Sequence, residues 1–312
     1  MILKRNIPLK DHSNYKIGGL ANYFFEFKSC EDLKTALSEY KKIDPSLKTV
    51  FVLGKGTNVL FSDKGFSGLV LKNALSGISL EFNQVSVSSG ILMEQLVYFS
   101  TNESISGFEW AGGLPGTVGG AIRGNAGAFG GEIKDNLVEV ISLCRNDLKT
   151  KVRNNLECEF DYRQSIFKKN DGENEIILSA KFAIEKGNGA EIKEKTQERI
   201  NYRILKHPLE YPNIGSIFKN IPIESISKDV LEEFKNYIKN DPFPVLPVAK
   251  LIVCANLMGK RIGDAQISEK HPNFIVNLNN ASAGDVIELM KIIREKILNK
   301  YKINLEEEIT IL

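Results

Sequence analysis

Several features that would narrow the function are scarce in this 312-residue sequence. Its four cysteines are widely spaced and form no Cys-x-x-Cys pair, which argues for reduced thiols rather than a disulfide framework or a zinc site. With three histidines and no His-Glu-x-x-His motif, a catalytic metal is not expected. No run approaches the roughly 18 apolar residues that cross a bilayer, and no apolar signal segment follows the first basic residues. We therefore expect a cytoplasmic protein without a membrane partner.

Charge of either sign is also not in excess. Lys and Arg total 41 and Asp and Glu total 39, so the formal net charge is +2. Nothing in that balance predicts a basic surface for nucleic acid. The remaining composition, 42% hydrophobic and 26% charged, is that of a globular protein. The length suffices for two or three domains of about 100–150 residues each.

Residue patterns predict alternating strands and helices over the chain. In the first 75 residues, Ser29 and Asp32 have the spacing of a helix cap, and the following helix carries Leu33, Leu37 and Tyr40 on one face. Near the C-terminus, Ser282 and Asp285 form a capping box before another amphipathic helix that extends to Tyr301. Strands are expected at Tyr23–Phe27, Val50–Leu53, Gly68–Lys72, Ile78–Phe82, Val85–Val87, Leu137–Leu143, Glu175–Ile184 and Glu308–Leu312, and helices at Leu92–Phe99, Ala190–Leu205, Val230–Ile238 and Val248–Leu257.

The most unusual stretch extends from Trp110 to Gly131. Nine of the 25 glycines lie between Gly112 and Gly131, a density that disfavours a regular helix or strand. Such a backbone can approach a pyrophosphate closely and direct its N–H groups at it. A flexible surface loop is the alternative, but Trp110, Leu114 and Val118 would be unusual in a solvated loop.

A second glycine-containing loop, Gly54-Lys-Gly-Thr-Asn-Val59, contains part of a dinucleotide-binding fingerprint. It lacks the third glycine, and a strand rather than a helix follows, which disfavours a Rossmann site. We expect the two loops to hold one extended dinucleotide between them.

Eight motifs occur together in the order found in one enzyme family. They are His12–Gly19, Gly54–Leu60, Gly113–Ala121, Asn125–Gly130, Tyr162–Ser165, Gly215–Asn220, Gly263–His271 and Leu305–Ile309. Together they resemble the UDP-N-acetylenolpyruvoylglucosamine reductases, enzymes of peptidoglycan precursor synthesis. The resemblance covers nearly the whole chain.

The resemblance implies an α+β fold: an FAD-binding fold of the vanillyl-alcohol oxidase-like type in two subdomains, followed by an α+β substrate-binding domain. The corresponding boundaries are 1–75, 76–205 and 206–312, with the last strand returning toward the FAD domain. The direct passage from Pro208–Pro212 to Gly215 is similar to the shorter of two family types, which lacks an extra substrate-covering loop. A monomer is expected.

The implied reaction reduces UDP-N-acetylglucosamine enolpyruvate to UDP-N-acetylmuramate. NADPH reduces FAD, and the reduced flavin passes a hydride to the terminal vinyl carbon. Arg163 matches the arginine that stabilises the substrate carboxylate as it becomes an enolate. Ser216 matches the proton donor, and Glu308 matches the acidic residue that assists the enolate. A shift of register would transfer that last role to Glu306 or Glu307.

The resemblance also assigns binding residues. Lys219, Asn220 and Gln266 match substrate contacts, whereas His271 is expected to be a packed side chain rather than a base. The predicted FAD contacts are Gly54, Lys55, Gly56, Thr57, Asn58, Val59, Gly113, Pro115, Gly116, Thr117, Gly119, Gly120, Asn125, Ala126 and Gly127.

Two stretches depart from the family pattern. Ile221–Pro247 intervenes before the helix that begins at Val248, and Cys254-Ala-Asn-Leu257 replaces a more acidic sequence. Two alternatives stay open. An FAD oxidase on the same scaffold is disfavoured because the glycine-rich segment has no histidine for a covalent flavin link. A non-catalytic nucleotide-sugar binding protein is disfavoured because Arg163, Ser216 and a terminal glutamate are all present.

Overall fold

The computed structural model describes residues 3–312, apart from the side chains of residues 170 and 171, and forms two compact units. Unit 1 contains the chain up to Ile7, Ala21–Lys55 and Ser67–Tyr202, and unit 2 contains Pro8–Leu20, Gly56–Phe66 and Arg203–Leu312. Met1 and Ile2, which begin the N-terminal stretch where no apolar signal segment is expected, lie outside the described residues. The units interleave along the chain, and the three consecutive domains expected from the sequence stay a prediction.

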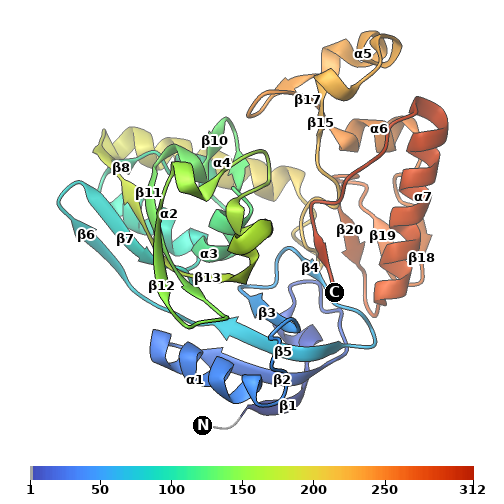
Figure 1. The fold of residues 1–312 in the computed structure, drawn as a ribbon. Helices are drawn as coiled ribbons and strands as arrows, with labels where there is room; N and C mark the ends of the chain where they lie inside the picture. Colours follow the sequence, from blue (N-terminus) through green and yellow to red (C-terminus); the bar gives the residue numbers. More distant parts are fainter. Residues whose placement is uncertain (1–2) are drawn as a thin grey trace. The chain divides into compact units, whose positions relative to one another are not determined.

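The first sheet of unit 1 has the strand order β1-β2-β5-β3, with β3 parallel to β5 (Figure 1). Helix α1 (Cys30–Lys41) begins as predicted, because Ser29 Oγ accepts the N–H of Asp32 at 3.0 Å. Leu33, Leu37 and Tyr40 of α1 are buried in one core with sheet residues. The strands are β1 (Lys4–Pro8), β2 (Leu20–Phe27), β3 (Val50–Leu53) and β5 (Phe66–Asn73).

The second sheet of unit 1 is antiparallel, in the order β12-β11-β13-β7-β6. Helices α2 (Met93–Asn102) and α3 (Val118–Arg123) contribute to the same core as its inward-facing residues. The strands are β6 (Ile78–Glu81), β7 (Gln84–Ser88), β11 (Leu137–Cys144), β12 (Thr150–Asn154) and β13 (Glu175–Ala183). Two short strands, β8 (Ile105–Ser106) and β14 (Glu185–Lys186), pair before α4 (Gly189–Lys206).

The glycine-rich segment is more regular than expected. It contains helix α3 and the hairpin of β9 (Gly127–Ala128) and β10 (Gly131–Glu132), so the prediction that it resists helix and strand is wrong. Thr117 caps α3 by accepting the N–H of Gly120, and Val118 and Ile122 are fully buried. Burial of an apolar face thus outweighs the low helix propensity of glycine.

Unit 2 is built around α7 (Ala283–Tyr301) and a sheet in the order β18-β19-β20 (Figure 1). The capping box predicted for α7 is confirmed, with Ser282 Oγ accepting the N–H of Asp285 at 3.0 Å. The final strand is shorter than predicted and pairs in parallel with β4. The remaining elements are α6 (Val248–Cys254), β4 (Val59–Leu60), β18 (Arg261–Ile262), β19 (Ala265–Ile267), β20 (Ile275–Asn277) and β21 (Thr310–Ile311).

The intervening segment Ile221–Pro247 is a folded part of unit 2. It forms a small sheet in the order β15-β17-β16 and helix α5, which ends at Phe234, earlier than predicted, before a 3-10 turn. The ring of Phe234 is buried edge-on against Tyr301 of α7, with 5.4 Å between ring centroids. Its elements are β15 (Ile221–Pro222), α5 (Lys228–Phe234), β16 (Lys239–Asn240) and β17 (Pro244–Leu246).

The four cysteines are free thiols, as the sequence predicts. Within residues 3–312, none of the helices is long and apolar enough to traverse a bilayer. The same described part of the chain contains no cluster of three His, Cys, Asp or Glu residues arranged to hold a metal ion.

Candidate active site

The two loops predicted to bind pyrophosphate meet in unit 1. Gly54, at the end of β3, lies against Thr117 at the start of α3, and a Cβ atom at Gly54 would lie 2.5 Å from Thr117 Oγ1. Only glycine permits this approach. The chain passes from unit 1 to unit 2 between Lys55 and Gly56, so the predicted contacts Gly56–Val59 belong to unit 2.

Lys72 of β5 adds a positive charge to the first loop. Its Nζ donates to the carbonyl of Gly54, and burial, followed by the nearby Lys55, lowers the pKa of Lys72. Lys72 is not among the residues predicted from the sequence. The sequence feature that could have indicated Lys72 is a lysine inside the otherwise buried run Leu69–Asn73. A half-buried cation in a strand is costly unless it has a hydrogen-bond partner or binds a ligand.

The second loop is fixed by hydrogen bonds within unit 1. The N–H groups of Val118 and Gly119 donate to the carbonyls of Ile91 and Ser89, both at 2.8 Å, and Gly116 accepts from Met93 at 3.0 Å. The N–H of Gly120 binds Thr117 Oγ1. Two predicted cofactor contacts, Gly119 and Gly120, therefore use their N–H groups inside the protein. The predicted residues from Gly113 to Thr117 precede α3 in the same loop.

Arg163 belongs to unit 1, where it occupies a turn closed by hydrogen bonds between Asp161 and Gln164. It has φ 56°, in the left-handed region. Its Nη2 donates to the carbonyl of Gly127 at 2.9 Å, and its own carbonyl accepts from Lys168 Nζ at 2.7 Å. The structure thus places the predicted catalytic arginine beside a predicted cofactor-binding glycine.

The segment that directly follows Ser216 is bonded to two other segments of unit 2. On one side, the N–H groups of Ile217 and Phe218 donate to the carbonyl and Oδ1 of Asn273 at 2.8 and 3.1 Å, and Asn273 Nδ2 donates to the carbonyl of Phe218 at 2.8 Å. On the other side, Glu308 N–H donates to the carbonyl of Ile217 at 2.8 Å, and Lys219 N–H donates to the carbonyl of Glu306 at 3.0 Å. The buried Asn273 was not predicted, although it lies two residues after His271, the end of a motif.

The C-terminal segment that contains Glu308 also contacts the first predicted cofactor loop. Asn58 Nδ2 donates to the carbonyl of Glu308 at 3.1 Å, and Thr310 N–H donates to the carbonyl of Asn58 at 3.0 Å. Both contacts lie inside unit 2. The structure therefore brings the segment that follows Ser216 together with Glu308 and Asn58, from three separate parts of the sequence.

The three consecutive glutamates have different surroundings. The carboxylate of Glu306 binds Lys219 Nζ at 2.9 Å, and that of Glu307 forms an ion pair with Arg294 of α7. Glu306 and Glu307 are therefore engaged by basic side chains of unit 2. The choice of Glu308 for the catalytic role stays a prediction from the motif.

The other predicted substrate contacts each use one polar group inside unit 2. Asn220 Oδ1 accepts the N–H of Val248 at 3.2 Å, and Gln266 Nε2 donates to the carbonyl of Gly259 at 3.1 Å. The ring of His271 packs against His207 and Phe274, with centroid distances of 5.4 and 4.7 Å. Burial lowers the pKa of His271 to about 4, so the ring is neutral near pH 7.

Known proteins resemble this chain over its whole length. A family model described as the C-terminal domain of UDP-N-acetylenolpyruvoylglucosamine reductase matches residues 207–312, and an FAD binding domain model matches residues 21–146. The mixed α+β class and the expected FAD-binding and C-terminal domains are thereby confirmed.

Full-length relatives support the same assignment. The UDP-N-acetylenolpyruvoylglucosamine reductase of Alkaliphilus oremlandii is 35% identical over 97% of this chain and 91% of its own. That of Carboxydothermus hydrogenoformans is 36% identical over 98% of this chain and 93% of its own. The crystal structure of the reductase from Thermus caldophilus aligns with a TM-score of 0.78 and 29% identity, covering 100% of this chain and 99% of that one. This chain therefore belongs to the UDP-N-acetylenolpyruvoylglucosamine reductase family.

Proposed function

We propose that this protein is an NADPH-dependent, FAD-mediated reductase that converts UDP-N-acetylglucosamine enolpyruvate to UDP-N-acetylmuramate in peptidoglycan precursor synthesis. The observation that carries the proposal is the set of contacts around the C-terminal segment of unit 2. Backbone hydrogen bonds link Ile217 and Lys219 to Glu308 and Glu306, and the Asn58 side chain donates to the carbonyl of Glu308. The full-length similarity to reductases favours this reading over an FAD oxidase or a non-catalytic binding protein.

The residues around Gly54 fit an FAD. Gly54 permits the close approach of the first loop to Thr117 of the second, and Lys55 and Lys72 supply positive charge suited to a pyrophosphate. The residues proposed to hold FAD are those of Gly54–Val59, Gly113, Pro115–Thr117, Gly119, Gly120 and Asn125–Gly127. When bound, FAD accepts a hydride from NADPH and supplies it to the enolpyruvyl group.

Three side chains would carry the rest of the chemistry. Hydride addition drives negative charge toward the substrate carboxylate, which the planar, permanently charged Arg163 is suited to stabilise. The carbon next to that carboxylate must then receive a proton, which Ser216 would donate from its hydroxyl group. A serine is a weak acid, but a carbanion-like centre is a strong base, so placement matters more than acidity. Glu308 would assist the developing enolate.

Lys219, Asn220 and Gln266 would bind the substrate. Lys219 suits the diphosphate or the carboxylate, because an ammonium group pairs with either anion. We further propose the shorter family type, since only residues 207–214 separate the end of α4 from Gly215. A monomeric protein acting in the cytoplasm, where UDP-sugars and NADPH are made, fits this function.

An absorbance titration tests the proposal. Purified protein loaded with FAD should show a flavin band near 450 nm (an approximate value for oxidised flavins generally) that bleaches on adding NADPH. Anaerobic addition of UDP-N-acetylglucosamine enolpyruvate should restore the band. A protein that takes up no FAD, or whose reduced flavin is reoxidised by oxygen but not by the substrate, would exclude the proposed reaction.

Ser216→Ala tests the assignment of the proton donor. The variant removes only the hydroxyl group, so reduction of the flavin by NADPH should stay within about 2-fold of wild type, whereas reoxidation by substrate should slow by at least about 100-fold. Stopped-flow absorbance measures both half-reactions separately. Equal slowing of the two would mean that Ser216 supports the fold or the cofactor rather than the protonation.

A further inference from the structure

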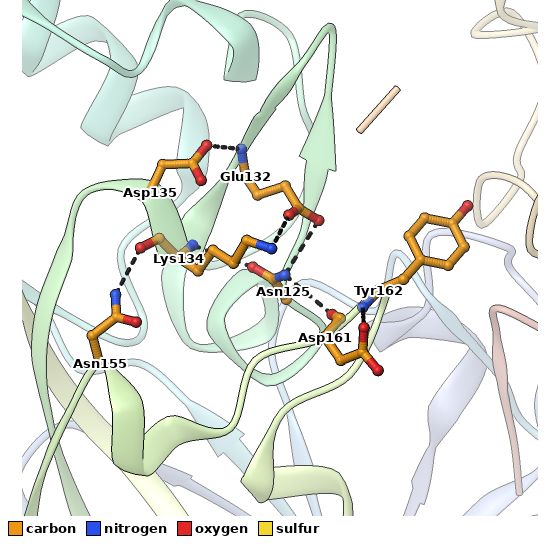
Figure 2. Close-up of polar contacts among 7 residues, drawn as sticks. All are labelled: Asn125, Glu132, Lys134, Asp135, Asn155, Asp161 and Tyr162. Carbon is orange, nitrogen blue, oxygen red and sulfur yellow. Dashed lines mark hydrogen bonds and ion pairs between the residues drawn. The ribbon is translucent and has the colours of Figure 1, made fainter. Parts of the chain in front are cut away.

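The turn that carries Arg163 is attached to a buried side-chain network in unit 1 (Figure 2). Asn125 is fully buried, and its amide group donates to Glu132 Oε1 at 3.2 Å and to the carbonyl of Asp161 at 3.1 Å. Its Oδ1 accepts the N–H of Lys134 at 3.2 Å. Asn125 therefore joins the glycine-rich segment to a residue two positions before Arg163.

Glu132 decides which way the Asn125 amide points. An ionised carboxylate can only accept hydrogen bonds, so it requires the NH₂ side of the amide. The Glu132 side chain is 3% exposed and is held by an ion pair with Lys134 Nζ at 2.8 Å. Its backbone N–H donates to the carboxylate of Asp135 at 2.7 Å, at the start of the 3-10 helix Ile133–Asp135 (Figure 2). Because every contact orients the next one, the network has one satisfied arrangement.

Glu132 also reaches Arg163 by a second route. In the β9–β10 hairpin, Glu132 lies directly opposite Gly127, whose carbonyl accepts from Arg163 Nη2. A Cβ atom at Gly127 would lie 2.7 Å from Cγ of Glu132, so the glutamate side chain packs on the bare backbone of that glycine. Glu132 thus packs against the residue whose carbonyl holds the guanidinium, and it is linked to the carbonyl of Asp161 through Asn125.

The backbone of Arg163 is in a conformation that needs such support. A residue with a Cβ atom adopts a positive φ at a conformational cost, and it persists where surrounding contacts enforce it. A guanidinium also recognises a carboxylate only when its plane is correctly oriented. A shift of the Asp161–Gln164 turn would therefore change the direction in which Arg163 presents its N–H groups.

We propose that Glu132, acting through Asn125 and Gly127, is a positioning residue that sets the orientation of Arg163 toward the substrate carboxylate. The proposal rests on the function proposed above for Arg163. The Asn125 side chain has an internal role in this arrangement, and its backbone N–H donates to the carbonyl of Ile122 at 3.1 Å.

Paired substitutions of Glu132 test the proposal in the full-length, FAD-loaded protein. Glu132→Met keeps the length of the side chain but removes both acceptors, whereas Glu132→Gln keeps one acceptor for Asn125. We expect Glu132→Met to slow substrate-driven reoxidation of the flavin by about 10- to 100-fold, because small misplacements of a catalytic group have effects of this size. Flavin reduction by NADPH should change by less than about 2-fold, and Glu132→Gln should restore most of the lost rate.

Glu139→Gln is the matched control, since it removes another glutamate of unit 1 whose ion pair with Lys181 is partly exposed. Its half-reactions should equal those of wild type. If Glu132→Met does not fold, Lys134→Met replaces it, because it removes the ion pair that holds the Glu132 carboxylate.

A double-mutant cycle separates positioning from other roles. If Glu132 acts through Arg163, adding Glu132→Met to Arg163→Lys should slow reoxidation by less than about 3-fold further. Without cofactor or substrate, Glu132→Met should also speed amide hydrogen exchange at Gln164, whose N–H closes the turn on Asp161.

Three results would overturn the proposal. They are equal slowing of both half-reactions by Glu132→Met, additive effects in the double mutant, and unchanged exchange at Gln164. A different result, full reoxidation in Arg163→Lys, would instead refute the function proposed for Arg163, so the two failures can be told apart.

Discussion

The stretches that carry Arg163 and Ser216 are held by different kinds of contact. Arg163 sits in a turn of unit 1 whose neighbours are fixed by buried side chains, above all Asn125 and Glu132. Ser216 begins an extended segment of unit 2 whose backbone is bonded on both sides, to Asn273 and to Glu306–Glu308. The first arrangement can be disturbed while the surrounding sheet stays intact. The second is part of the core of its unit, so changes there should affect stability before they affect the rate.

The largest effect in this comparison is expected from Asn273→Ala. The substitution removes the partners of both the N–H and the carbonyl of the fully buried Phe218. Each buried group left without a partner costs about 1–3 kcal/mol, so the free energy of unfolding should fall by about 2–5 kcal/mol. Urea denaturation measures this, with the exposed Asn280→Ala as a control expected to lie within about 0.5 kcal/mol of wild type. A loss below about 1 kcal/mol would show that Asn273 does not support the Ser216 segment.

A smaller effect should appear as acid sensitivity of unit 2. Burial lowers the pKa of both His207 and His271 to about 4. An unfolded histidine takes up its proton near pH 6.5, so the unfolded state binds more protons below that pH and stability falls as pH drops from 6.5 through 4. Stability should fall progressively over this window, and His271→Phe should remove about half of the loss. Equilibrium unfolding between pH 8 and pH 4 checks the slope, with the two proteins expected to agree closely at pH 8.

Unit 1 should respond to acid in a lower window. Burial alone would raise the pKa of Glu175, but hydrogen bonds from Arg153, Ser142 and Lys151 outweigh it and lower that pKa to about 2. Stability is therefore present above pH 4.5 and is lost as pH falls toward 2, by about 2 kcal/mol. Glu175→Gln should flatten this acid limb in unfolding experiments, while Glu139→Gln should keep it. If both variants keep the wild-type slope, the Glu175 network does not set the acid stability of unit 1.

The smallest effect is expected from Glu306→Gln. The carboxylate of Glu306 is 75% exposed and pairs with Lys219, so it would compete with the substrate for the contact proposed for Lys219. Exposed ion pairs contribute about 0–1 kcal/mol, so releasing Lys219 should lower KM for the UDP-sugar by at most about 5-fold with kcat unchanged. Lys219→Met should do the opposite and raise KM by about 10-fold or more. Steady-state kinetics separate the two, and a raised KM in Glu306→Gln would mean that Glu306 orients Lys219 rather than competing for it.

Local signals in the sequence predicted the helices best. The caps at Ser29 and Ser282 act on N–H groups three residues away, so the starts of α1 and α7 could be predicted without knowing the fold. Strand β12 was not predicted, because Thr150–Asn154 is an edge strand with little burial and therefore no alternation of apolar residues. Helix α3 was missed because its stability comes from burying Val118 and Ile122 rather than from its residues' helix propensity.

The candidate site divides along the same line. Motifs identify Arg163, Ser216, Lys219 and Glu308 by residue type and order. Lys72 lies outside every motif. Asn273 supports the site through hydrogen bonds to the backbone of Phe218, which is 55 residues away in the sequence. Sequence spacing also does not reveal that Glu306 pairs with Lys219 and Glu307 with Arg294 of α7.

The sequence by itself determined the family, the α+β class, the FAD-binding segment and the residue types of the proposed chemistry, because these follow from local patterns and motif order. The tertiary structure decided which contacts use those residues. It placed Pro8–Leu20 and Gly56–Phe66 in the same unit as the C-terminal residues and joined Glu308 to Asn58. It also linked Glu132 to the Arg163 turn through Asn125 and Gly127. Such pairings join residues far apart in the chain, and their free energy comes from burial and hydrogen bonds that exist only after the chain has folded.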